Sequence, residues 1–224
     1  MSARDEILAN IRRSLGVTGS EAPRQAAVSE RLKQAPAGIV PARGQGDLAA
    51  RTATFVFEAE RAQASVTQVA GAAEVPAEIA RFLRDNNLPA TLRMGEDAQL
   101  AAMPWGETTL EIAHGPSDGH DLNAVSAAFA AVAESGTLAL CSGPDNPTTL
   151  NFLPDNHIAV VFARDIVGDY ESVWQSVRAA YGKGVMPRTL NFITGPSRSA
   201  DIEQTLLLGA HGPRRLHIVV VGEA

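Results

Sequence analysis

The sequence predicts an α/β domain of three layers, in which helices flank a mainly parallel sheet. The runs IAVVF at 158–162 and IVVV at 218–221 are continuously apolar and largely β-branched. Strands buried on both faces have this composition, and they belong to parallel sheets covered by helices. Segments with helical periodicity alternate with the predicted strands, which is the order expected for this architecture. A chain of 224 residues buries roughly 70% of its unfolded surface, so it needs no disulfide or metal to fold.

The elements of this domain follow from hydrophobic periodicity and from turn residues. Helical patterns cover about 47–63, 76–86, 169–181 and 200–208. Strands are expected at 65–69, 137–141, 157–162 and 216–221, and near 108–112 and 190–193. No internal repeat is visible, so we expect a single domain from residue 46 to residue 224.

An arm of residues 1–45 is expected to precede the domain. Residues 3–15 are predicted as an amphipathic helix, with Ser2 as its N-cap and Gly16 at its end. Its apolar stripe consists of Ile7, Leu8, Ile11 and Leu15. A helix this short is marginal in isolation, so we expect it to dock on its own domain, on a twin subunit or on a different partner protein. Residues 16–45 are rich in Gly, Pro, Ser and Gln, which is typical of an extended linker.

Composition excludes several classes of protein. With 19 basic and 25 acidic residues the net charge is −6, which argues against a general nucleic-acid binder. One cysteine, Cys141, excludes a disulfide scaffold and an iron–sulfur cluster held by this chain alone. We interpret Cys141 as a small buried hydrophobe. No stretch is long and apolar enough to span a membrane, and the first residues lack a signal-peptide pattern, so the cytoplasm is the expected compartment.

Three polar segments are the candidates for chemistry, because ligands of open α/β sheets bind outside the carboxyl ends of strands. The first segment places Glu134 before Thr137 at the start of a strand, and Gly143, Asn146 and Thr148 after that strand. Glu134 is a possible base or nucleophile, or a residue that caps a turn. The Asp-Asn-Pro-Thr-Thr stretch can cradle a ligand with its side chains, or it can form an Asx turn.

The second segment leads into the buried strand predicted at 157–162. It contains Asn151 and ends at His157. A histidine at the start of a strand is either a hydrogen-bonded structural residue or a group that transfers protons near neutral pH. Both readings of His157 stay open.

The third segment joins the strand near 190–193 to a predicted helix. Gly195, Ser197, Arg198 and Ser199 suit an anion at a helix N-terminus, where free N–H groups point outward. Asp201 and Glu203 in the first turn would repel a bare anion, so they are expected to cap the helix, to orient Arg198 or His211, or to bind a metal. His211 and Gly212 then turn the chain into the last strand.

Standard catalytic and cofactor fingerprints are missing from the sequence. It has no G-x-G-x-x-G after a strand, no P-loop, no G-x-S-x-G and no H-E-x-x-H. The candidate catalytic residues are therefore Glu134, Asp201, Glu203 and His211. The candidate ligand-binding residues are Thr137, Gly143, Asn146, Thr148, Asn151, His157, Gly195, Ser197, Arg198, Ser199 and Gly212. No metal site is predicted.

Taken in order, these segments resemble the lactate utilization protein C family, within the wider LUD domain group. The resemblance rests on AVAESGTL at 131–138, GPDNPTTLNFLP at 143–154, GPSRSADIEQ at 195–204 and LGAHGP at 208–213. EILANIR at 6–12 is similar to the N-terminal helix of that family. The resemblance implies a NagB/ribose-5-phosphate isomerase/CoA-transferase type of α/β fold.

The same resemblance implies a role in the oxidation of L-lactate to pyruvate. It implies a non-cluster accessory or substrate-handling subunit beside two iron–sulfur partner proteins, with the clusters in those partners and no cofactor in this chain. Whether a flavin or a metal sits here, and whether the chain forms a homo-oligomer, stay open. Two alternatives remain, which are a CoA-transferase-like enzyme that uses Glu134 and a regulatory module that binds a small organic acid without chemistry.

Overall fold

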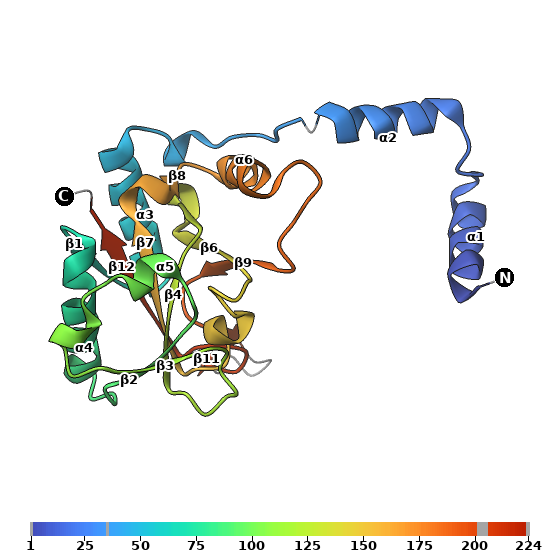
Figure 1. Cartoon of the computed structure of the whole chain (residues 1–224). Coiled ribbons are helices and arrows are strands. Elements are labelled where there is room, and N and C mark those ends of the chain that lie inside the picture. Colours follow the sequence, from blue (N-terminus) through green and yellow to red (C-terminus); the bar gives the residue numbers. More distant parts are fainter. Residues whose placement is uncertain (1, 35, 201–205, 223–224) are drawn as a thin grey trace. The chain divides into compact units, whose positions relative to one another are not determined.

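The structure is a computed structural model that describes residues 2–34, 36–200 and 206–222. It divides into two compact units, Met1–Val40 and Pro41–Ala224 (Figure 1). None of the described helices is long and apolar enough to cross a membrane.

The N-terminal unit contains two helices, α1 (Ala3–Leu15) and α2 (Ala22–Gln34). The predicted limits of α1 are confirmed, with Ser2 in a capping box and Gly16 in the left-handed conformation. The prediction of an extended linker is wrong for α2. Its Pro lies in the first turn, where proline is tolerated, and its other residues are mostly Ala, Gln, Arg, Glu and Lys, which favour helix. Neither helix has a buried residue.

A six-stranded sheet in which every pairing is parallel forms the centre of the second unit. Its strands, in spatial order, are β1 (Ser65–Val69), β12 (Arg215–Val221), β7 (Asn156–Phe162), β4 (Asn123–Ala127), β2 (Thr91–Met94) and β3 (Glu111–His114). The two apolar runs predicted as buried strands are β7 and β12, which pair near the middle of the sheet. The predicted α/β class with a mainly parallel sheet is confirmed.

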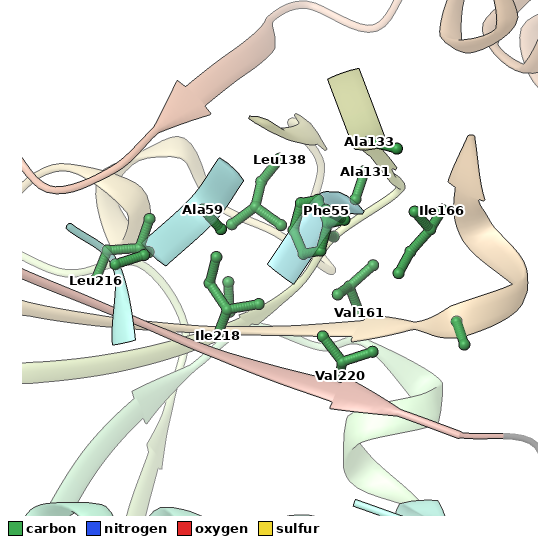
Figure 2. Close-up of a cluster of buried hydrophobic side chains, with 14 of the residues drawn as sticks. Phe55, Ala59, Ala131, Ala133, Leu138, Val161, Ile166, Leu216, Ile218 and Val220 are labelled. Atoms are coloured by element: carbon green, nitrogen blue, oxygen red, sulfur yellow. The ribbon is translucent and has the colours of Figure 1, made fainter. Parts of the chain in front are cut away.

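Helices α4 (Val75–Asp85) and α5 (Ala98–Ala101) pack on one face of this sheet. Helix α3 (Leu48–Arg61) packs on the other face. A second sheet, β8-β5-β6-β9, shares that face, so the core there lies between two sheets. Figure 2 shows Phe55 of α3 at the centre of this core, with Ala131 above it and Val161 below.

The second sheet consists of β8 (Ile166–Val167), β5 (Ala130–Val132), β6 (Thr137–Cys141) and β9 (Leu190–Thr194). Helix α6 (Tyr170–Tyr181) packs on it through Val173 and Val177. Short 3₁₀ helices complete the unit: η1 (Ala42–Gly44), η2 (Ala72–Glu74), η3 (Trp105–Glu107), η4 (Ala133–Ser135), η5 (Thr148–Asn151) and η6 (Ala163–Asp165).

The helix predicted at 200–208 is wrong. Backbone strands β10 (Arg198–Ala200) and β11 (Leu206–Leu208) pair antiparallel there, and residues 201–205 lie outside the described part of the chain. A short apolar run such as Leu206–Leu208 fits a helix or a strand equally well by pattern. The strand pairing between Arg198 and Leu208 decides between the two here.

Candidate functional site

A cavity of about 260 Å³ opens at the amino ends of β7 and β12. We call it the amino-edge cavity. It is lined by Asn151, Phe152, His157, Phe192, Ile193, Thr194, Gly195, Pro196, Ser197, Arg198, His211, Gly212, Pro213 and Leu216. The expectation that the second and third segments sit at carboxyl ends of parallel strands is wrong, because Asn151 precedes β7 and His211 precedes β12. The structure nevertheless brings these two segments together.

A short hydrogen-bonded chain lies at the inner end of this cavity. The Oγ of Ser126, on β4, is 2.6 Å from Nε2 of His157 and donates to Oδ1 of Asn151 at 3.1 Å. A serine has one hydroxyl proton. Because that proton goes to Asn151, His157 must carry its own proton on Nε2 and donate it to Ser126. Nδ1 of His157 is then a bare acceptor.

Two polar atoms of this group of three hydrogen-bonded residues have no partner. Nδ1 of His157 and Nδ2 of Asn151 are buried and have no hydrogen-bond partner among the described residues. Each such group costs about 1–3 kcal/mol when it is left unpaired. His157 is 1% exposed and Asn151 is fully buried, and both line the cavity. One acceptor and one donor without partners therefore belong to residues that line the cavity.

Burial sets the charge of the histidine. Burial lowers the pKa of His157 to about 4, since desolvation disfavours the imidazolium. His157 is consequently neutral at physiological pH. A neutral ring is what allows Nδ1 to accept a hydrogen bond.

The rim of the cavity is basic. Arg198 and His211 line it, and none of its described lining residues is acidic. The side chain of Arg198 donates to the carbonyl of Ala62, at the C-terminal end of α3. Ser197 accepts from the His211 N–H at 3.2 Å, which ties the two lining loops together. This rim suits an anionic group.

Gly195 fixes the position of one wall. It has φ +69°, and a Cβ there would lie 2.1 Å from the Ala62 carbonyl oxygen. Only glycine combines that conformation with such close approach to another backbone. The loop from β9 can therefore reach the cavity only because Gly195 packs on the end of α3.

Thr137 does not line the amino-edge cavity but contacts a residue that does. Its hydroxyl is 2.6 Å from that of Thr194, which lines the cavity, and 2.9 Å from that of Tyr170. Sequence reasoning missed Ser126 and Thr194. Ser126 lies in the strand NAVSA, which has too few β-branched residues to be predicted as a strand. Thr194 is the last residue of β9 and directly precedes Gly195, where the third polar segment begins.

The other predicted residues fall elsewhere. Glu134 is 5% exposed, belongs to η4, and does not line the amino-edge cavity. Its Oε2 has no partner in the described part of the chain. Gly143 and Thr148 also lie outside this cavity, while Asn146 lines a different one. Asp201 and Glu203 lie outside the described residues, and only the backbone of Ser199, in β10, is described.

Of the four candidate catalytic residues, only His211 is therefore placed at the amino-edge cavity. Across the described ranges, no three His, Cys, Asp or Glu side chains converge as metal ligands. Cys141 is a free thiol whose pKa is raised, chiefly by burial.

Comparison with known proteins shows that part of the chain is similar to a domain family. The LUD domain model matches residues 123–221, a range that contains Ser126 and the whole lining of the amino-edge cavity. The crystal structure at 1.70 Å of a DUF162 family protein from Deinococcus radiodurans shares the fold, with a TM-score of 0.59 and 24% identity over 80% of this chain and 100% of that one. Residues 123–221 are therefore similar to the LUD domain family.

Relatives named lactate utilization protein C match part of the chain. The one from Geobacillus sp. (strain WCH70) is 42% identical over 91 residues, which is 40% of this chain and 38% of that protein. The one from Bacillus subtilis (strain 168) is 39% identical over 93 residues, or 41% and 39%. The matched stretch thus spans about two fifths of the relatives' length. The segment EILANIR at 6–12 lies outside the LUD match.

Proposed function

We propose that this chain takes part in lactate utilization and that its amino-edge cavity holds the small hydroxy acid of that process. One observation carries the proposal, namely the unsatisfied pair formed by His157 Nδ1 and Asn151 Nδ2 beneath a basic rim. The names of the matched relatives supply the substrate class.

The chemistry of lactate matches this pair. Its hydroxyl can donate to Nδ1 of His157, and its carboxylate can accept from Nδ2 of Asn151. Arg198 at the rim offers the carboxylate a charged donor, which strengthens such a bond. Pyruvate has no hydroxyl and would leave Nδ1 unpaired. The cavity should consequently bind L-lactate more tightly than pyruvate.

We place the chain as a substrate-handling subunit of an L-lactate oxidation system. Conversion of lactate to pyruvate releases two electrons and two protons. In this scheme the electrons pass to two iron–sulfur partner proteins, because the single cysteine here is too few for a cluster. His157 holds the hydroxyl of lactate, and Asn151 and Arg198 hold the carboxylate.

A binding titration tests the cavity. Calorimetry of the full chain with L-lactate, pyruvate and propionate should give the highest affinity for L-lactate. Asn151→Leu should weaken lactate binding about 10-fold, since one hydrogen bond to a charged group is worth about 1.5–3 kcal/mol. Asn10→Leu, at an exposed position on α1, is the control and should change nothing. Equal affinity for lactate and propionate would exclude the assigned role of His157.

Reconstitution tests the pathway role. Lactate oxidation should require this chain together with the two iron–sulfur proteins, and its deletion should prevent growth on L-lactate. Lactate binding without any effect on oxidation or growth would favour the regulatory alternative.

The N-terminal unit supplies a docking segment in this scheme. Ile7, Ile11 and Leu15 of α1 are 59%, 49% and 64% exposed and share one face of the helix. Residues 1–44 carry seven basic and four acidic groups, whereas the chain as a whole is acidic. Ile7→Ser together with Ile11→Ser should abolish co-purification with the iron–sulfur proteins without changing lactate affinity. Unchanged co-purification would reject this assignment.

A further inference from the structure

A second cavity lies at the opposite edge of the six-stranded sheet. It measures about 370 Å³ and is reached from the carboxyl ends of β2, β4 and β7. Asp97 follows β2, Phe129 follows β4 and Arg164 follows β7, and all three line it. We call it the carboxyl-edge cavity. The carboxyl ends of parallel strands are where α/β proteins generally bind ligands.

Asn146 is the key residue of this cavity. It is 5% exposed, and its Nδ2 donates to the Cys141 carbonyl at 3.1 Å. That bond fixes the orientation of the amide, so the other atom is Oδ1, an acceptor. Oδ1 is buried and has no partner among the described residues. An occupant that satisfies Asn146 must bring a hydrogen-bond donor.

The charges around Asn146 are mostly negative. Asp97, Asp145 and Asp165 line the cavity. Arg164 is the one basic residue among the lining residues described, and its charge is paired with Asp165, 3.9 Å away, so Asp97 and Asp145 remain in excess. An anion would be repelled here, whereas a cation would be attracted.

The other residues that line the carboxyl-edge cavity indicate which kind of cation it suits. In the described ranges no three His, Cys, Asp or Glu converge closely enough to ligate a metal. Two aromatic rings, Phe129 and Tyr181, line the cavity with their centroids 6.3 Å apart. Aromatic faces attract organic cations and also contact their carbon chains.

We propose that the carboxyl-edge cavity binds an organic ammonium group. The N–H donors of the ammonium satisfy Oδ1 of Asn146, its charge is balanced by Asp145, and its carbon chain lies against Phe129 and Tyr181. The site is independent of lactate binding, because it shares no lining residue with the amino-edge cavity.

The test is an NMR titration of the full chain with 1,4-diaminobutane, with 1,4-butanediol as the uncharged control. Saturable shifts of residues around Asn146 are expected with the diamine and not with the diol. Asn146→Ala should weaken diamine binding about 10-fold, as expected for one lost hydrogen bond of about 1.5 kcal/mol. Asp145→Asn, at an exposed position that does not endanger folding, should weaken it about 3-fold.

Asp85→Asn is the matched control, because it removes one exposed carboxylate on α4 outside the cavity. It should leave diamine affinity unchanged. Equal binding of the diol, the same loss in Asp85→Asn as in Asp145→Asn, or no saturation at all would overturn the proposal. The last result would assign the cavity to ordered water. None of these outcomes bears on lactate binding at the other edge.

Discussion

The two edges of the parallel sheet differ in charge and in the polar atoms that they leave unsatisfied. At the amino edge, Arg198 and His211 line the same cavity as Asn151 and His157, which have an unsatisfied donor and an unsatisfied acceptor. At the carboxyl edge, three aspartates line the same cavity as Asn146, which has an unsatisfied acceptor. The charge of the lining residues favours a ligand of opposite charge, and the unsatisfied atom favours a ligand with the complementary donor or acceptor. One sheet can thus separate two kinds of ligand.

Each edge also depends on a glycine packed against another backbone. A Cβ on Gly195 would lie 2.1 Å from the Ala62 carbonyl oxygen, and a Cβ on Gly95 would lie 2.1 Å from that of Asp145. Both contacts position a loop that lines a cavity. Substituting one of these two glycines should therefore disturb one edge and leave the other unchanged.

The largest expected effect is that of Gly195→Ala at the amino edge. The clash with Ala62 and the left-handed backbone should together lower the free energy of unfolding by about 4 kcal/mol. Gly182→Ala is the control, since Gly182 has φ +93° and open space around its Cα. It should cost about 1 kcal/mol. Urea unfolding measures the free energy of unfolding of both variants. Equal losses of free energy would show that the contact between Gly195 and Ala62 contributes nothing to stability.

Gly95→Ala should act at the other edge. It should weaken diamine binding by displacing the backbone of Asp145, while lactate affinity stays unchanged. Gly106→Ala, with no atom within 4 Å of its added Cβ, should change neither. Loss of lactate binding in Gly95→Ala would mean that the edges are coupled.

Acid should destabilise the amino edge through its histidine. The pKa of His157 is lowered by burial to about 4, from an ordinary 6.5. Between these values the unfolded chain binds the extra proton and the folded chain does not, so stability falls as the pH decreases from about 6.5 to about 4. The full loss is about 3 kcal/mol for this histidine.

His217 on β12 behaves similarly, because burial also lowers its pKa to about 4. Urea midpoints measured between pH 7.5 and 4 should therefore decline, and the decline should be smaller in His157→Gln. Asn10→Leu, at an exposed position on α1 that carries no titratable group, is the control and should keep the wild-type slope. An unchanged slope in His157→Gln would contradict the buried neutral state of this ring.

Ser126→Ala should cost about 2 kcal/mol, because it leaves Nε2 of His157 and Oδ1 of Asn151 without their shared partner. Lactate affinity should fall as well, since the tautomer of His157 is no longer fixed. Diamine affinity should stay constant. Ser176→Ala on α6, which removes one bond to a helix carbonyl, should cost less than about 0.5 kcal/mol. Calorimetric unfolding and both titrations decide the outcome.

Arg198→Gln has the smallest expected effect. Arg198 is exposed, so losing its charge should weaken lactate binding only about 5-fold, with stability unchanged. The loss should disappear at high salt, where exposed charges are screened. Arg188→Gln, outside the cavity lining, serves as the control. An identical loss in both variants would reduce the role of Arg198 to general electrostatics.

Strong local patterns explain what was predictable from the sequence. The runs in β7 and β12 predict a buried parallel pair because both are continuously apolar. Strands β4 and β5, with the sequences NAVSA and AAV, were missed because alanine and asparagine carry no strand preference. Their strand character comes from pairing with distant neighbours. The same is true of β10 and β11, which were predicted as helix.

The candidate site was predictable by residue type but not by position. Asn151, His157, Gly195, Ser197, Arg198, His211 and Gly212 were all predicted, and all line one cavity. Their position before β7 and β12 follows from the sequence, but their convergence on one cavity does not, because it depends on the pairing of β7 with β12 and of β6 with β9. Ser126 was not predicted as a site residue, since its role depends on hydrogen bonds to two residues at least 25 positions away.

The ring nitrogens of His157 give the most direct test. In chain labelled with ¹⁵N-histidine, the Nδ1 resonance of His157, assigned with His157→Gln, should report an unprotonated nitrogen at pH 7. It should shift saturably toward lower frequency as L-lactate is added, and should not respond to propionate or 1,4-diaminobutane. A Nδ1 resonance that stays constant while lactate binds would place the ligand elsewhere and contradict the proposed site.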